Sequence, residues 1–205
     1  VAAQLDKAGI PISIVNPRRI RSFANSMGKL AKTDKIDAKI IAMYGKAFDP
    51  DPQKLPDEME SALKELVIRR LQIVDIIVAE KNHLSSTENE LIKKDIEINL
   101  QFLKKRLDDI ESKIKAMIKD SPVWNEKVEL LTSVIGVGKI TAFVMIATFP
   151  ELGDSTGRKV ASLGGVAPMT RQSGKWNGKS FTQGGRKHIR SSLYMASLSA
   201  IRFNP

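Results

Sequence analysis

Apolar residues follow a helical spacing through the middle of the chain. The clearest stripe alternates steps of four and three residues over Ile96, Leu100, Leu103, Leu107, Ile110, Ile114 and Met117. A shorter stripe precedes it at Val67, Leu71, Val74 and Val78. This spacing places apolar side chains on one face of a helix and is typical of a coiled-coil seam. We therefore predict a coiled-coil arm over residues 56–122, made of two long helices that fold back as a hairpin or are slightly broken.

The segment before the arm has the pattern of an α/β domain. Residues 1–8 fit the end of a helix closed by Gly9, and Ile10 to Val15 alternates and is β-branched, as in a strand that Asn16-Pro17 ends. Residues 23–30 are predicted to form a polar loop. Thr33 is a candidate N-cap for a helix from Asp34 to Lys46. Because one strand cannot form a stable sheet, we expect further strands upstream of Val1. Residues 1–55 are thus predicted to be the C-terminal part of an α/β domain.

The segment after the arm, residues 123–205, is predicted to be helical. Apolar stretches flank Ile135-Gly136-Val137-Gly138-Lys139. A helix, a Gly-x-Gly turn and a second helix are the pattern of a helix-hairpin-helix, whose backbone N–H groups bind phosphate. A buried corner between two helices is the alternative. A final helix is expected from Arg186 onward, so the fold class is mainly α with a truncated α/β start.

Positive charge is concentrated at the two ends of the chain. Residues 1–55 carry ten Lys or Arg against five Asp or Glu, residues 56–154 carry fourteen against eighteen, and residues 155–205 carry nine against none. A segment without acids, such as residues 155–205, favours a polyanionic partner, of which nucleic acid is the commonest. The alternative is a solvated basic surface. The candidate DNA- or RNA-binding residues are Arg18, Arg19, Lys32, Gly136, Gly138, Lys139, Arg171, Lys175, Arg186, Lys187 and Arg190.

The composition excludes several other classes of protein. The chain has no cysteine and only two histidines, which rules out disulfides, thiolate nucleophiles and a histidine-based metal site. No apolar run approaches the ~20 residues that span a bilayer, and no secretory signal is visible. We expect a cytoplasmic protein without a membrane partner, present here as a fragment.

Two aspartates form a candidate metal site. Asp34 and Asp37 are three residues apart at the start of a predicted helix, so their Cβ atoms lie about 5–6 Å apart on one face. Two carboxylates at this distance can bind a hard cation such as Mg²⁺, and Lys32 and Lys35 would attract a phosphodiester to it. The alternative is that both acids only complement the helix dipole.

A serine in the basic C-terminal segment is a candidate nucleophile. Ser173 precedes Gly174 and lies between Arg171 and Lys175 in a glycine-rich loop. A serine hydroxyl can attack phosphorus where cations hold the phosphate and a base takes up the proton. Spacing alone does not separate Ser173 from its competitors Ser162, Thr170 and Ser180.

Taken together, these motifs carry a family resemblance. They are, in order, Asn16-Pro17, Lys32-Thr33-Asp34-x-x-Asp37-Ala38, the helical arm, Ile135-Gly136-Val137-Gly138 with Ala142, Gly165-Val166-Ala167-Pro168, Ser173-Gly174, Gly184-Gly185-Arg186, Arg190 and Leu193-Tyr194. Their order and spacing resemble the insertion sequence 110 family of transposases, the DEDD recombinases related to the pilin-gene invertases, over essentially the whole chain.

The resemblance implies both a fold and a mechanism. Residues 1–55 would belong to a RuvC-like, RNase H-type domain whose four acidic residues bind Mg²⁺. Asp34 and Asp37 match the last two of these acids, and the other two would lie before Val1. Ser173 would become covalently joined to DNA. The resemblance also implies a guide RNA that bridges two DNA molecules, and a dimer or tetramer at the synapse.

The predicted function is therefore DNA strand cleavage and transfer by a metal-dependent transposase with a serine nucleophile. We expect this fragment alone to be incomplete and inactive. One alternative is a non-catalytic module that binds nucleic acid and dimerises through its coiled-coil arm. Another is a metal-dependent nuclease that uses water and forms no covalent intermediate. If the protein is such a nuclease, the Ser173→Ala variant should stay active. If it is a transposase, the variant should lose strand transfer.

Overall fold

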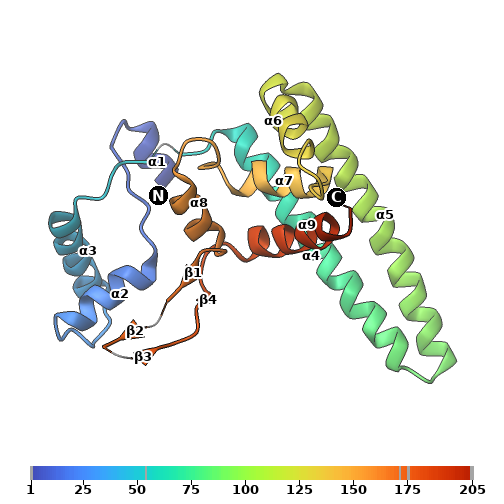
Figure 1. The fold of residues 1–205 in the computed structure, drawn as a ribbon, viewed down its shortest axis with the longest axis horizontal. Helices are drawn as coiled ribbons and strands as arrows, with labels where there is room; N and C mark the ends of the chain where they lie inside the picture. The colour runs from blue at the N-terminus through green and yellow to red at the C-terminus, as the bar shows by residue number, and fades with distance from the viewer. Residues whose placement is uncertain (1, 54, 171, 175, 204–205) are drawn as a thin grey trace. The chain divides into compact units, whose positions relative to one another are not determined.

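The computed structural model describes residues 2–53, 55–170, 172–174 and 176–203. It is mainly helical and divides into two compact units, Val1–Asp57 and Glu58–Pro205 (Figure 1). Among the described residues, no helix combines the length and the apolar character needed to cross a membrane. The two units are described separately below.

The first unit contains α1 (Ala2–Lys7), α2 (Pro17–Ser26) and α3 (Asp34–Phe48). The start of α3 confirms Thr33 as its N-cap, because the Thr33 side chain accepts a hydrogen bond from the Ile36 amide. Helix α2 is not among the elements predicted from the sequence, and the predicted polar loop over residues 23–30 is wrong for residues 23–26. Asn16-Pro17 starts this helix, because the Asn16 side chain caps it and proline suits its first position.

The predicted strand over residues 10–15 is not formed among the described residues. The segment is instead tied to the end of the same unit. The Ser13 hydroxyl donates a hydrogen bond to the Pro50 carbonyl at 2.6 Å, and the Gln53 amide donates to the Ile12 carbonyl at 2.7 Å. No neighbouring strand is available within the described residues, so a sheet ladder cannot form there.

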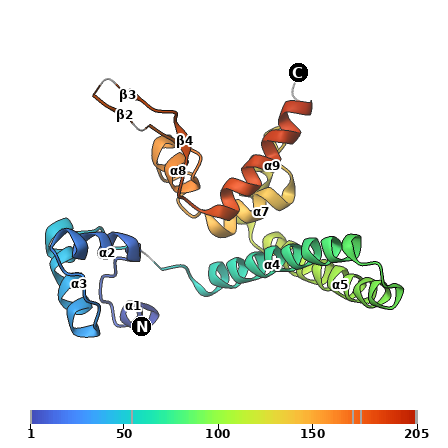
Figure 2. The same cartoon turned by 90° about the horizontal axis from the view of Figure 1, so that it is seen from below.

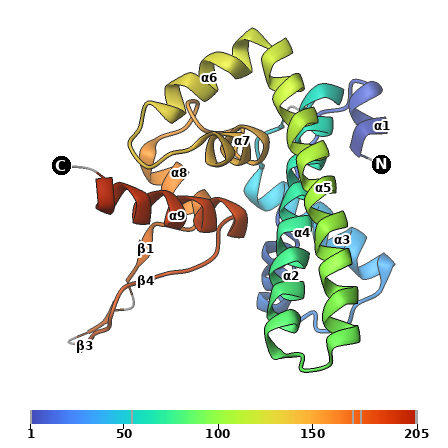
Figure 3. The same cartoon turned by 90° about the vertical axis from the view of Figure 1, so that its right-hand side faces the viewer.

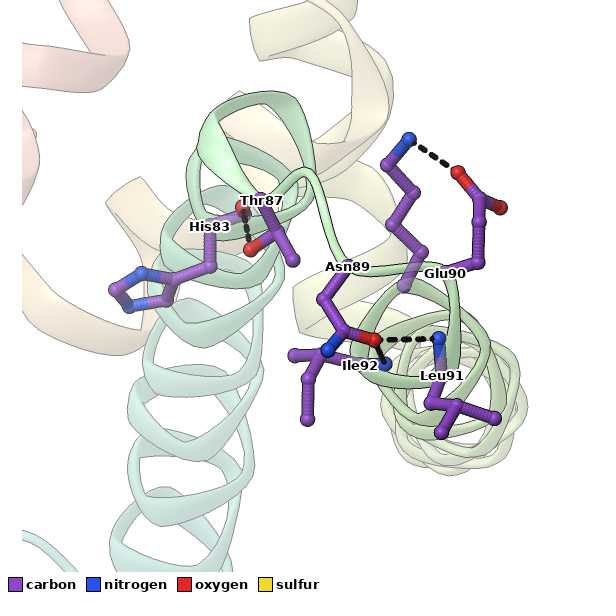
Figure 4. A network of polar contacts seen from close by, with 7 residues as sticks. His83, Thr87, Asn89, Glu90, Leu91 and Ile92 are labelled. Atoms are coloured by element: carbon purple, nitrogen blue, oxygen red, sulfur yellow. Dashed lines mark hydrogen bonds and ion pairs between the residues drawn. The ribbon is translucent and has the colours of Figure 1, made fainter.

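The predicted arm is a hairpin of two long helices, α4 (Glu58–Ser86) and α5 (Glu90–Asp120), which lie side by side (Figures 1 and 3). Residues 87–89 form the turn. There the Thr87 hydroxyl donates to the His83 carbonyl, and the Asn89 side chain caps α5 by accepting from the amides of Leu91 and Ile92 (Figure 4). These three hydrogen bonds satisfy backbone groups that a helix end leaves without a partner.

The apolar stripe of α5 faces α4, and its residues Ile96, Leu100, Leu103 and Ile114 are buried. The stripe predicted on α4 is partly wrong. Val67 is buried as expected, but Ile73 and Ile77 are buried further along while Val78 is exposed. The contact face of α4 therefore turns away from the predicted stripe. An ion pair of 2.8 Å between Arg70 and Glu111 also joins the two helices.

The C-terminal helices pack around α7 (Lys139–Thr148), which contacts α4, α6 (Pro122–Thr132) and α9 (Lys187–Phe203) (Figure 3). Four consecutive residues of α7, from Ala142 to Met145, are buried. A helix that is apolar on all sides belongs at the centre of a core. α8 (Gly157–Gly164) completes this group of helices and contacts α9.

A long hairpin connects α8 to α9 and extends away from the helices (Figure 2). Its proximal part pairs β1 (Pro168–Met169) with β4 (Phe181–Thr182), and its distal part pairs β2 (Gln172–Ser173) with β3 (Trp176–Asn177). Both pairs are antiparallel. We call residues 166–184 the hairpin loop.

Candidate functional site

Asp34 and Asp37 both lie in the first turn of α3, as the sequence predicts. Asp34 is exposed and Asp37 is half-buried. Neither carboxylate forms an ion pair or a side-chain hydrogen bond within the described part of the chain. Both are therefore available to an external cation.

The chemistry of these two side chains suits Mg²⁺, because carboxylate oxygens are the ligands that this ion prefers. The described residues contain no group of three or more His, Cys, Asp or Glu that could hold a metal ion. Asp34 and Asp37 thus provide a partial set of ligands. A metal bound in this unit would need further oxygen ligands from water, from phosphate or from another segment.

The predicted basic residues of the first unit occupy different elements. Arg18 and Arg19 lie in the first turn of α2, and Lys32 lies just before α3; all three are exposed. Arg18 and Arg19 line a hollow of about 410 Å³ together with Phe23, Tyr44 and Phe48. This aromatic group was not predicted, because the predicted helix ends at Lys46, before Phe48. The four-residue step from Tyr44 to Phe48 is the signal that could have indicated it.

The two glycines of the Gly-x-Gly turn have different surroundings. Gly136 has φ +90°, and a Cβ there would overlap the Ala196 carbonyl oxygen and lie 2.8 Å from the Ala200 amide nitrogen. Gly136 therefore allows the turn to approach the backbone of α9. Gly138 is the N-cap of α7, and a Cβ added to it would have no other atom within 4 Å. Gly138 and Lys139 are both exposed. Only the Gly138-Lys139 end of this turn is open to a phosphate.

Glycines also close the base of the hairpin loop. A Cβ on Gly165 would overlap the Gly184 carbonyl oxygen, and a Cβ on Gly185 would lie 2.8 Å from the Gly164 carbonyl carbon. Both residues also have positive φ, +72° and +64°, which favours glycine. The backbones of Gly164-Gly165 and Gly184-Gly185 therefore cross and pack directly against each other. This contact fixes where the loop leaves the helices.

Arg186 sits beside the same crossing. Its guanidinium donates two hydrogen bonds to the Glu151 carboxylate, at 2.5 and 2.6 Å, and lies 5.3 Å from the centre of the Phe149 ring. The hydrogen bond from Arg186 lowers the pKa of Glu151 below its ordinary value of 4.5. No acid lies near Arg186 in the sequence, and its partner Glu151 comes from a segment 35 residues earlier.

The other cations at the start of α9 differ in exposure and contacts. The Arg190 guanidinium donates to the Gly184 carbonyl at 2.5 Å, so it too supports the base of the hairpin loop. Lys187 is exposed and forms no ion pair with the described residues. Lys187 is therefore the freest of the predicted phosphate contacts on this helix.

Ser173 lies in the distal strand pair of the hairpin loop and is exposed. It is paired with Trp176, whose side chain is 60% exposed. Paired residues of an antiparallel ladder project from the same face, with Cβ atoms about 4.5–5.5 Å apart. Ser173 and Trp176 thus form an exposed pair of a hydroxyl and an indole. The predicted neighbours Arg171 and Lys175 lie outside the described residues.

The competing hydroxyls occupy less distal positions. Ser162 lies on α8, and its carbonyl accepts the Gly165 amide at the base of the loop. Thr170 and Ser180 are exposed in the loop but lie outside its strands. Ser173 alone among these four is in a strand of the distal pair.

Comparison with known proteins gives two family matches. The model of the transposase IS116/IS110/IS902 family matches residues 128–205, and the DEDD transposase model of IS110 elements matches residues 1–91. The pilin gene-inverting protein of Moraxella bovis is 28% identical over 190 residues, and that of Moraxella lacunata is 28% identical over 191. Each alignment covers 91% of this chain and 59% of the relative. The chain therefore spans less than two thirds of the length of the curated relatives that it matches.

Proposed function

Since the chain belongs to the IS110 family of transposases, we propose that it forms part of an enzyme that cuts and rejoins DNA with metal-bound aspartates and a serine nucleophile. The proposal uses one site from each unit. The single observation that carries it is the position of Ser173, exposed in the distal pair of a hairpin loop whose base is fixed by crossing glycines.

In this mechanism Asp34 and Asp37 bind Mg²⁺, with the remaining ligands supplied from outside the described residues. A metal held by Asp34 and Asp37 would supply neutralisation of charge on the phosphate and its orientation for attack. The acids are suited to this role because both lack ion-pair partners in the described structure. They correspond to the last two acids of the four that the family resemblance implies.

Ser173 then attacks phosphorus. A new bond forms between the serine oxygen and phosphorus as the bond from phosphorus to the leaving sugar oxygen breaks. The proton of the hydroxyl is transferred to that sugar oxygen, so the strand is cut and one end stays on the protein. Attack by the oxygen of a second strand reverses this step and joins the two DNA ends. The indole of Trp176, opposite Ser173, provides a surface on which a neighbouring base can stack.

The DNA backbone is positioned by residues outside the reacting centre. Lys139 and the open end of α7 provide one phosphate contact, and Lys187 provides another. Arg171 and Lys175 are proposed to flank the attacked phosphate. Arg186 and Arg190 act mainly by holding the hairpin loop, because the described contacts of both are with the protein. A guide RNA remains part of the proposal through the family resemblance alone.

We also propose that copies of the chain associate through the arm as a dimer or tetramer. The α5 stripe packs against α4 within one chain, so the association must use another surface of the hairpin. Ile98 and Phe102 are exposed apolar residues on α5 and are suited to it. Ile98→Lys is expected to lower the assembled fraction in sedimentation without lowering the stability of the monomer. An unchanged assembly would remove this face of the arm from the proposal.

A DNA strand-cleavage assay tests the metal site. The protein used is this chain together with any residues that its gene encodes before or after it. Cleavage of DNA carrying the ends of the element should require Mg²⁺ and should be lost in Asp34→Asn and Asp37→Asn. Asp6→Asn, which changes an exposed acid of α1, is the matched control. Cleavage that survives in both variants would exclude the proposed metal site. Cleavage that survives in Ser173→Ala would favour the water-using nuclease instead.

A further inference from the structure

We propose that the hollow between α2 and α3 binds one unpaired nucleotide of a single strand, with the base on Phe48 and the phosphate on Arg18 and Arg19. All of its lining residues belong to these two helices, which contact each other (Figure 2). Its volume of about 410 Å³ is in the range of small-molecule sites. The assignment of a base to the aromatic residues does not depend on the serine mechanism.

The aromatic wall of the hollow is organised by three rings. The Tyr44 and Phe48 rings are 4.5 Å apart and tilted by 31°, while Phe23 meets both nearly edge-on at 5.6 and 5.8 Å. Tyr44 is buried, whereas 55% of Phe48 is exposed. Tyr44 and Phe23 therefore hold Phe48 in place and leave part of its ring available. Any nucleobase can stack on such a ring, because every base has a π-face.

The hollow is also lined by two cations. Arg18 and Arg19 line the hollow and form no ion pair or side-chain hydrogen bond with the described residues. α2 contains Arg21 as a third cation and no acid. Two free guanidinium groups suit a phosphate, which they can bind in a bidentate manner. Ser22 and Ser26 add hydroxyl groups that can bond to the sugar or the base edge.

A flat apolar surface beside two unpaired guanidinium groups matches the two ends of one nucleotide. In a duplex the face of a base is covered by its neighbours, so only an unpaired base can reach Phe48. An acidic peptide would satisfy the arginines but would make no special use of the ring. We therefore assign the hollow to single-stranded DNA or RNA.

The position of the hollow on α3 relates it to the proposed metal site, and this step rests on the proposed function. Tyr44 and Phe48 follow Asp37 by seven and eleven residues, so each ring projects within about 20° of the direction of Asp37 around the helix. The rise from Asp37 to these rings is about 10–16 Å. At about 3.4 Å per stacked nucleotide this corresponds to roughly three to five nucleotides, or fewer in an extended strand. The held nucleotide would thus belong to a strand that continues to the metal.

The test measures binding of a short fluorescent oligothymidylate to the full chain by anisotropy, in the presence of a chelator so that the metal site plays no part. Phe48→Ala should weaken binding about fivefold to a hundredfold, as expected for the loss of one stacked base. With an oligonucleotide of the same length that lacks all bases, Phe48→Ala should have no effect. Met43→Ala is the apolar control, because Met43 is also exposed but is separated from Tyr44 by about 100° on the helix.

The arginines have their own matched control. The double variant Arg18→Ala/Arg19→Ala should weaken binding of both oligonucleotides and reduce the slope of log affinity against log salt by about 1.4. Lys39→Ala/Lys46→Ala removes the same charge from exposed positions on the opposite side of α3 from the rings, and should have a smaller effect.

Three results would overturn the proposal. The first is an equal effect of Phe48→Ala on the two oligonucleotides, and the second is no effect on either. The third is displacement of the oligonucleotide by an equal concentration of thymidine monophosphate, which would assign the hollow to a free nucleotide. None of these results bears on Ser173, so the proposed function and this inference can fail independently.

Discussion

Replacing Gly136 by alanine should destabilise the second unit, because this glycine allows the turn before α7 to touch α9. A residue with a Cβ costs about 1–2 kcal/mol in a left-handed conformation, and φ at Gly136 is +90°. The added methyl group would also overlap the Ala196 carbonyl and lie 2.8 Å from the Ala200 amide. Backbone atoms cannot rotate away, and such overpacking costs about 1–3 kcal/mol. The expected loss is therefore about 2–5 kcal/mol.

Tryptophan fluorescence during urea unfolding measures this loss selectively. The two tryptophans of the chain, Trp124 and Trp176, both belong to the second unit, and Trp124 packs against its core. Gly157→Ala is the control, because Gly157 has ordinary φ and no atom within 4 Å of a built Cβ. Its free energy of unfolding should change by less than about 0.5 kcal/mol.

The same experiment separates two roles for Gly136. If this glycine served only to expose its amide to a phosphate, Gly136→Ala would weaken DNA binding and leave the unfolding curve unchanged. An unfolding free energy within about 0.5 kcal/mol of the parent would refute the close contact with α9.

Three further predictions test the arm, the loop base and the phosphate contact. Ile114→Ala removes a fully buried side chain and should cost about 2–5 kcal/mol in urea unfolding, whereas Ile98→Ala, at an exposed position of α5, should cost less than about 0.5. Because Arg186 lowers the pKa of Glu151 in the folded state, the pair contributes stability above the unfolded pKa and loses it as pH falls through the folded value. Glu151→Gln should therefore narrow the stability difference between neutral and acidic pH, and an unchanged difference would contradict the pairing. Lys139→Ala should weaken duplex binding and lower the salt slope by about 0.9 without changing stability; an unchanged slope would exclude the phosphate contact.

Patterns within one element were predictable from the sequence. The α5 stripe, the Thr33 cap of α3 and the final helix after Arg186 all follow from local spacing, and the structure has them. The α4 stripe was only partly correct, because α4 is apolar around much of its surface and its partner decides which face is buried. Helix α2 was missed because its Asn-Pro start was interpreted only as the end of a strand.

Contacts between distant segments could not be predicted from spacing. The crossing of Gly165 with Gly185 joins two ends of a long loop, and each glycine on its own resembles an ordinary turn residue. The partner of Arg186 is similarly hidden, because Glu151 lies in a different segment and carries no motif. These contacts change the interpretation of the C-terminal segment, since part of its positive charge supports the hairpin loop.

The central claim, a serine that becomes joined to DNA, is tested most directly by trapping the adduct. The chain, with any residues that its gene adds, is incubated with Mg²⁺, RNA flanking its gene and labelled DNA carrying the ends of the element. The products are separated under denaturing conditions, and the peptide that carries the nucleotide is identified by mass spectrometry. We predict an adduct on Ser173 that is absent from Ser173→Ala and Asp34→Asn and retained in Ser180→Ala. An adduct on another residue, or strand transfer without any adduct, would contradict the account.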